Sequence, residues 1–237
     1  MYGRITIIMA GIVALGLLAL LAIGYANRAL HQVQPYYARA IELDSEMLAQ
    51  DSHAMECRIA SLVTDATTDS SWQTAFSERE VNGWLAVALK EKFADLLPES
   101  VVDPRVDFGA NEAVIGFRYL GEELSTVISV RVSVWVAETD VVAIRLKKCH
   151  AGTLPIPVSK VVDQMIAAAD KLNASLRWTQ QAGDPVALIS LRGVLSVADE
   201  QRCLQSVELY EGELYLAGST ASVEPLLAEK AEETVLR

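Results

Sequence analysis

The sequence predicts an α+β protein: an N-terminal transmembrane helix and a helical stalk come first, and an antiparallel sheet packed on two helices follows. Three observations lead to this prediction. Residues 5–23 form an unbroken apolar run, residues 77–97 and 157–172 place apolar side chains at helical spacing, and residues 126–136 alternate between apolar and polar side chains. Helices and strands that are segregated along the chain, rather than alternating, are typical of α+β proteins.

The apolar run ITIIMAGIVALGLLALLAI at residues 5–23 contains Thr6 as its one polar side chain and no charge. A helix needs roughly 20 apolar residues to cross the hydrocarbon core of a bilayer. We therefore expect residues 1–27 to be a membrane anchor that contacts the lipid bilayer through residues 5–23. A cleaved signal peptide is the alternative, because Gly24-Tyr25-Ala26 resembles a cleavage site, but its apolar region is normally about 7–15 residues long.

The charges beside the span nearly balance, since Arg4 precedes it and Arg28 and Arg39 follow it. The long C-terminal part has the profile of a translocated domain. We therefore expect a single-pass protein with a cytoplasmic N-terminus and an extracytoplasmic C-terminal domain.

The charge balance argues against binding to nucleic acid. The chain has 20 basic and 31 acidic residues, a net charge of −11, whereas proteins that bind DNA or RNA must neutralise phosphates. The three cysteines, Cys57, Cys149 and Cys203, allow one disulfide with a free thiol, or three small buried apolar side chains. Three small buried side chains are the favoured reading, and spacing does not choose which two cysteines would pair.

No sequence motif for catalysis, phosphate binding or metal binding is present among those of hydrolases, zinc proteins and nucleotide-binding loops. Cys149 and His150 are adjacent, so on a strand their side chains point to opposite faces and do not form a nucleophile–base pair. We expect a protein that is not an enzyme and that carries no cofactor and no metal.

The organisation after the anchor follows from periodicity. Residues 28–63 carry apolar side chains at helical spacing and predict a helical stalk, and the polar residues 64–75 predict a linker. Residues 76–220 are the expected α+β domain, and residues 221–237 are a charged tail.

The first helix of the domain has a clear start signal. Ser77 and Glu80 have the spacing of a capping box, in which each side chain bonds the backbone N–H of the other residue. Later, residues 126–136 and 141–149 predict a long hairpin, and further strands are expected at residues 176–179, 186–197 and 206–217. The last of these contains a turn that pairs Leu209 with Leu214 and Val207 with Leu216.

Two short segments resemble those of a known class of proteins. FSEREVNGWL at residues 76–85 resembles the S/T-x-x-E-x-N-x-x-L helix start of small bacterial envelope proteins of the YpmS and YceB type. AGTLPIP at residues 151–157 resembles the Gly-x-Leu-Pro-x-Pro segment that enters their second helix. These proteins are similar to the tubular lipid-binding (TULIP) superfamily, in which a long helix is wrapped by a strongly bent antiparallel sheet.

The resemblance implies a bent sheet, a place in the bacterial inner membrane with the domain in the periplasm, and an apolar groove between helix and sheet that binds lipid acyl chains. The residues expected to line this groove are Val130, Val132, Val134, Ile144, Leu146, Met165 and Ile166. A closed core would use the same residue types, and the sequence does not separate the two.

A different class of function fits the same chain. A tethered acidic domain without a catalytic motif could be an envelope scaffold or assembly factor that binds another envelope protein. Arg131, Ser133 and Trp135, on the polar face of residues 126–136, are then the expected contacts with the partner.

Overall fold

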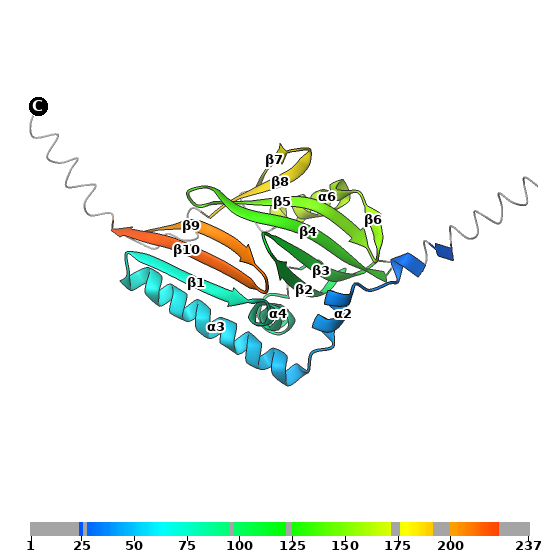
Figure 1. Cartoon of the computed structure of the whole chain (residues 1–237), viewed down its shortest axis with the longest axis horizontal. Coiled ribbons are helices and arrows are strands. Elements are labelled where there is room, and N and C mark those ends of the chain that lie inside the picture. Colours follow the sequence, from blue (N-terminus) through cyan, green and yellow to red (C-terminus); the bar gives the residue numbers. More distant parts are fainter. Residues whose placement is uncertain are drawn as a thin grey trace, which may run out of the picture.

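The structure is a computed structural model that describes residues 24–25, 28–94, 97–121, 125–171, 176–191 and 200–222. It confirms a mixed α+β protein in which helices pack on antiparallel sheets (Figure 1). The described helices are α2 (Pro35–Ile41), α3 (Ser45–Thr68), α4 (Glu78–Ala86), α5 (Ala88–Lys92) and α6 (Val158–Lys171).

The larger sheet has seven strands in the order β2-β3-β4-β5-β8-β7, and β6 pairs with β5. Every pairing is antiparallel. The strands are β2 (Val101–Gly109), β3 (Glu112–Leu120), β4 (Ser125–Glu138), β5 (Val141–Ala151), β6 (Leu154–Ile156), β7 (Leu176–Gln181) and β8 (Asp184–Ser190).

The smaller sheet has three strands in the order β1-β10-β9: β1 (Ser71–Ser77), β9 (Glu200–Tyr210) and β10 (Glu213–Ser222). The predicted turn is confirmed, with Leu209 opposite Leu214 and Val207 opposite Leu216. Gly212, at φ +75°, takes the left-handed conformation that this turn requires.

The long hairpin predicted from residues 126–136 and 141–149 is also confirmed, as β4 and β5, with Val134 opposite Ile144. Asp140 lies in its turn at φ +62°. The Asp140 side chain accepts a hydrogen bond from the backbone N–H of Leu204 in β9 (2.9 Å), so this turn ties the two sheets together.

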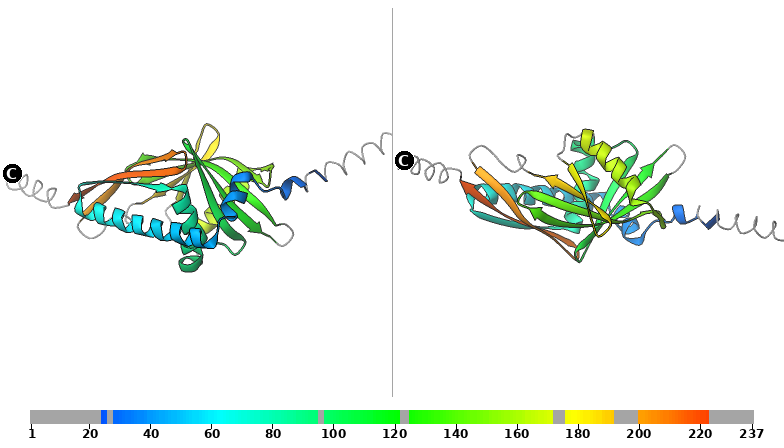
Figure 2. Two further views of the ribbon diagram at one scale, coloured as in Figure 1. Left: turned by 60° about the horizontal axis from the view of Figure 1, so that its bottom comes forward. Right: turned by 90° about the horizontal axis from the view of Figure 1, so that it is seen from above.

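The region between the predicted anchor and the predicted domain differs from the prediction. Residues 28–63 are largely helical, but α3 continues to Thr68 and runs alongside β1 and α4 rather than standing apart from the domain (Figures 1 and 2). The expected linker at residues 64–75 is instead the end of α3 and most of β1. The reason is that Trp72 and Phe76, two apolar residues in a polar stretch, are both buried and fix β1 to the core.

Strand β2 was not predicted either. Pro104 interrupts its pattern, and Asp103 has φ +52° at a shift in the β2–β3 register. Proline is tolerated here because β2 is the edge strand of its sheet.

The two sheets share a continuous core. The main buried cluster draws on β2, β3, β4, β5 and β9, and partly buried residues of α4 and α6 pack against it. Its buried members are Val106, Phe108, Ala113, Val130, Val132, Leu146, Cys149 and Leu209.

The cysteines match neither sequence-based alternative in full. Cys149 is a buried core residue, and burial raises the pKa of its thiol to about 11. Cys57 is exposed on α3, and neither Cys57 nor Cys149 is in a disulfide.

None of the described helices combines the length and apolar character needed to span a membrane. The predicted anchor segment, residues 5–23, and residues 223–237 of the predicted tail lie outside the described residues.

Candidate functional site: an apolar pocket beside strand β2

The chain that follows the predicted anchor lies against the larger sheet. Backbone oxygens of Ala29 and Leu30 accept hydrogen bonds from Thr153 N (2.9 Å) and Thr126 Oγ1 (2.5 Å). Gln34 donates from Nε2 to Ser129 Oγ (2.7 Å). A side chain at Gly152, which has φ +59°, would place its Cβ 2.2 Å from the Ala29 oxygen, so only glycine allows this approach. We call residues 28–41 the N-terminal strap.

Helix α2 ends the strap and packs over β2 and β3. The Tyr37 hydroxyl donates to the backbone oxygen of Asp103 (2.8 Å). Arg105 donates from Nε to the backbone oxygen of Ala40 (3.2 Å). These contacts hold α2 directly above the irregular stretch of β2.

Helix α4 covers the open edge of β2. The predicted capping box is present: Glu80 N donates to Ser77 Oγ (3.3 Å), and Ser77 N donates to Glu80 Oε2 (2.8 Å). One turn later, Asn82 donates from Nδ2 to the Val106 oxygen and accepts from Val106 N, both at 2.8 Å. The amide side chain therefore takes the place of a neighbouring strand.

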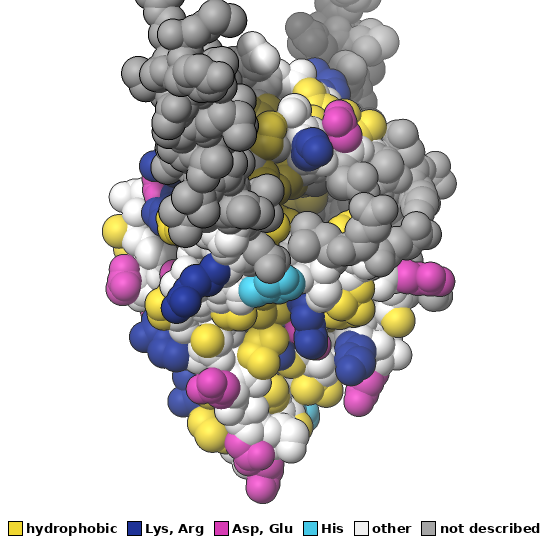
Figure 3. Space-filling model, turned by 90° about the vertical axis from the view of Figure 1, so that its right-hand side faces the viewer, with side chains coloured by type: hydrophobic (Ala, Val, Ile, Leu, Met, Phe, Trp, Pro, Cys, Tyr) yellow, Lys and Arg dark blue, Asp and Glu magenta, His cyan; other side chains and the backbone are white. Residues whose placement is uncertain are grey.

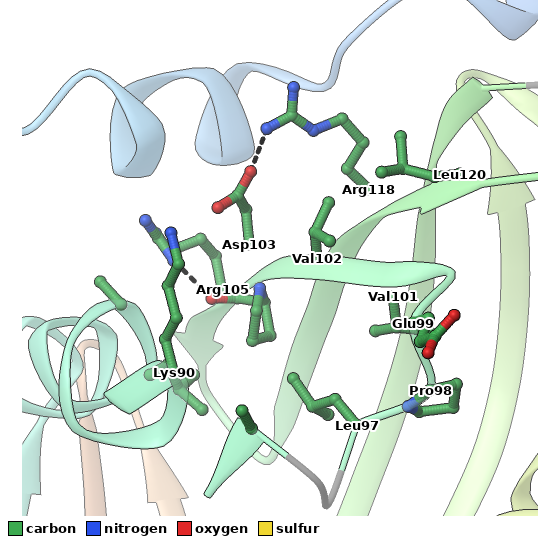
Figure 4. Close-up of a pocket in the computed structure, with 14 residues that line it drawn as sticks. Lys90, Leu97, Pro98, Glu99, Val101, Val102, Asp103, Arg105, Arg118 and Leu120 are labelled. Atoms are coloured by element: carbon green, nitrogen blue, oxygen red, sulfur yellow. Dashed lines mark hydrogen bonds and ion pairs between the residues drawn. The ribbon is translucent and has the colours of Figure 1, made fainter. Parts of the chain in front are cut away.

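A pocket of about 570 Å³ opens between α4–α5, the segment that follows them, and β2 (Figure 4). Figure 4 shows Leu97, Pro98 and Val101 on one side of the β2 ribbon and Val102 on the other, toward Arg118 and Leu120. We call this the β2 pocket. Its apolar lining consists of Leu85, Ala86, Ala94, Leu97, Pro98, Val101, Val102, Pro104 and Leu120.

Charged side chains also line the β2 pocket. Lys90, Arg105 and Arg118 supply three cations, and Glu99 and Asp103 supply two carboxylates. Arg118 forms an ion pair with Asp103, and that hydrogen bond raises the pKa of Arg118. Burial lowers the pKa of Arg105, which is 5% exposed, and the nearby Asp103 opposes this effect.

The residues predicted to line a groove lie mostly in the core. Val130, Val132 and Leu146 are buried there, and Val134 and Ile144 are partly buried against them. Ile166, on α6, is 38% exposed. Met165 belongs to α6 as well, but its side chain is outside the described residues.

The three residues predicted to contact a protein partner share one face of β4. Arg131 forms an ion pair with Glu112 (3.1 Å), and Lys147 reaches the same carboxylate (2.5 Å). Hydrogen bonds from Lys147 and Arg131 lower the pKa of Glu112. The Arg145 guanidinium lies 5.5 Å from the centre of the Trp135 ring. Ser133 and Trp135 line a shallow pocket of about 400 Å³ together with Glu112, Arg145 and Lys147, whereas Arg131 does not line it.

Sequence reasoning did not find the β2 pocket, because its residues come from α4, α5, β2, β3 and the segment before β2. In the sequence, this region is a short run in which Pro98 and Pro104 flank two valines. The run has neither helical nor strand periodicity, so it did not predict a structural element.

Figure 3 shows the end of the molecule beside the N-terminal strap. A hollow with hydrophobic side chains along its floor is visible in the upper half of this face. Among the described residues, no group of three or more His, Cys, Asp or Glu side chains could hold a metal ion.

No family model, curated protein or solved structure matches this chain.

Proposed function

We propose that this protein is a membrane-anchored, non-enzymatic lipid-binding protein of the bacterial envelope whose extracytoplasmic domain holds an acyl chain in the β2 pocket. The observation that carries the proposal is the pocket itself: its volume of about 570 Å³ lies in the range of small-ligand sites, and its walls are largely apolar. Each methylene transferred from water to such walls contributes about 0.8 kcal/mol.

The proposed site replaces the groove expected from the sequence. An acyl chain among Val130, Val132 and Leu146 would have to open a packed core, whereas the β2 pocket is already open between helix and sheet. We also propose that the protein is related to the TULIP proteins. Two features of the segment that resembles them support this: Ser77 and Glu80 cap α4, and Asn82 positions that helix on β2, beside the pocket.

Photoactivatable lipids test this function on the full-length chain in its own membrane. Cells grown with a diazirine fatty acid would incorporate it into their lipids, and labelled peptides would be identified after irradiation. We expect label in two places: in residues 5–23, and in the pocket segment around residues 97–105.

The variant Val102→Trp should fill the pocket and abolish label in residues 97–105, while label in residues 5–23 continues and serves as an internal control. Val63→Trp is the matched substitution, because Val63 is 53% exposed on α3, outside the β2 pocket. Unchanged pocket label in a folded Val102→Trp protein, or no pocket label in the unaltered chain, would contradict the proposal.

An envelope scaffold is the second candidate. The observation that favours it is that Ser133 and Trp135 line one shallow pocket, while Arg131 pairs with Glu112 of the same pocket. A scaffold predicts lipid label in residues 5–23 alone, so the same experiment separates the two functions.

A further inference from the structure

Positive charge is concentrated at the β2 pocket in a chain that is strongly acidic. The whole chain has a net charge of −11, whereas the charged residues of the pocket, three cations and two carboxylates, sum to +1. A general attraction to anions is therefore not expected of this protein. Any preference for an anion at this pocket must come from the local arrangement of cations.

Arg105 is the most buried of these cations, with 5% of its surface exposed. Its Nε donates to the Ala40 oxygen (3.2 Å) and one Nη donates to the Pro104 oxygen (2.7 Å). Within the described part of the chain both acceptors are neutral carbonyls, and no carboxylate forms an ion pair with Arg105. A buried guanidinium has five N–H donors and a high cost of desolvation, so a further anionic partner would be favourable.

Lys90 comes to the same pocket from α5. Figure 4 shows its side chain extending along the pocket wall toward the guanidinium of Arg105. In the described ranges, no acceptor or carboxylate pairs with its ammonium group. Arg118 differs from both, because Asp103 already pairs with it.

We infer that the β2 pocket selects an amphiphile with an anionic headgroup, a carboxylate or a phosphate, that Lys90 and Arg105 bind while the apolar walls hold the acyl chain. This inference rests on the proposed function and names the class of lipid. Charge-assisted hydrogen bonds to both groups would fix the headgroup beside these two side chains.

The same contacts allow a purely structural role, in which Arg105 serves to join α2 to β2. That role makes no use of Lys90 and gives no preference between anionic and neutral lipids. Substitution of Lys90 therefore separates binding from structure, and it leaves the buried Arg105 in place.

The test uses the full-length chain in phosphatidylcholine vesicles that contain a trace of one photoactivatable lipid. Three probes with the same diazirine acyl chain are compared: phosphatidylglycerol, the free fatty acid and diacylglycerol. The measured quantity is the label in residues 97–105 divided by the label in residues 5–23. This ratio removes differences in how much of each probe reaches the membrane.

We expect the ratio to be about tenfold higher for one or both anionic probes than for diacylglycerol, which corresponds to about 1.4 kcal/mol, the scale of one charge-assisted hydrogen bond. The anionic probe with the higher ratio would show whether the ligand carries a phosphate or a carboxylate. Lys90→Gln should remove most of this preference. Lys92→Gln is the matched control: it lies two residues away on the same helix, removes the same charge, and pairs with Glu56 instead of lining the pocket.

Equal ratios for anionic and neutral probes, unaffected by Lys90→Gln, would overturn the inference and leave the proposed function standing. Absence of pocket label with all three probes would contradict the proposed function itself, and the inference with it.

Discussion

Asn82 shows how one side chain can complete a sheet. It is 3% exposed, and its amide makes both hydrogen bonds that a neighbouring strand would make to Val106. Asn82→Ala would leave a buried N–H and a buried C=O of the edge strand without partners. We expect this change to reduce the free energy of unfolding by about 2–4 kcal/mol, measured by urea denaturation with tryptophan fluorescence.

Gln205→Ala provides the comparison. Gln205 also makes a side-chain hydrogen bond, to Ser219 Oγ (2.9 Å), but it is exposed, so water replaces the lost contact. We expect a change below about 0.5 kcal/mol. A similar loss of stability in both variants would show that the Asn82 amide is not needed to complete the edge of β2.

The same helix start shows what could be predicted at the scale of residues. The capping box was found from the sequence because Ser77 and Glu80 are three residues apart and bond each other. The role of Asn82 depends on Val106, which is 24 residues away on a strand that the sequence did not reveal. Hydrogen bonds between residues that are close in the sequence can therefore be predicted from it, whereas those between distant residues cannot.

At the scale of elements, α3 and α4 are joined by close packing and by a partly buried ion pair. A side chain at Gly83 would place its Cβ 2.6 Å from the backbone nitrogen of Ser52, so glycine permits the helices to touch. Arg58 of α3 donates to Glu80 Oε1 from Nε (3.0 Å) and from an Nη (2.7 Å).

This ion pair predicts a pH-dependent stability. Burial raises the pKa of Glu80, but hydrogen bonds from Arg58 and Ser77 outweigh it and hold the pKa below the ordinary value of 4.5. A carboxyl group with a lowered pKa stabilises the fold above its unfolded pKa and loses that contribution as the pH falls through its folded pKa. The urea midpoint of the unaltered protein should exceed that of Arg58→Gln at pH 7, and the difference should shrink below about pH 4.

Arg79→Gln is the control for this prediction. Arg79 pairs with Asp51 across the same two helices, but its side chain is 63% exposed, and such pairs contribute little. We expect its urea midpoint to stay close to that of the unaltered protein from pH 3 to 7. If the difference in urea midpoint between the unaltered protein and Arg58→Gln stays constant over this pH range, the effect cannot be assigned to Glu80.

The elements divide into those that the sequence reveals and those that it does not. β4 was predicted because its side chains alternate from Ile128 to Val136, and β5 because the apolar residues Val142, Ile144 and Leu146 occupy every second position. β1 and β2 were missed because β1 has only Trp72 and Phe76 to fix it, and β2 is broken by Asp103 and Pro104. The β2 pocket is formed beside this broken strand, so the sequence pattern was weakest at the candidate site.

At the scale of the molecule, the N-terminal strap relates the pocket to the predicted anchor. Leu120 lines the β2 pocket, and its neighbour Tyr119 pairs with Thr126, whose hydroxyl donates to the Leu30 oxygen. The chain from residue 23 to residue 30 spans at most about 25 Å. The strap therefore limits how far this end of the domain can lie from the membrane, while the C-terminal end of α3 lies at the opposite end of the molecule (Figure 1).

This arrangement predicts that the pocket faces the bilayer that would hold the predicted anchor, residues 5–23. Leu120 is 45% exposed beside the strap, and Val63 is 53% exposed on the C-terminal half of α3. With the photoreactive residue p-benzoylphenylalanine at position 120 of the full-length chain, we expect phospholipid adducts after irradiation of native membranes. At position 63, which is just as exposed but far from the strap, we expect none. Equal lipid labelling at both positions would show that the strap does not hold the pocket at the membrane surface, and an acyl chain would then have to reach the domain by another route.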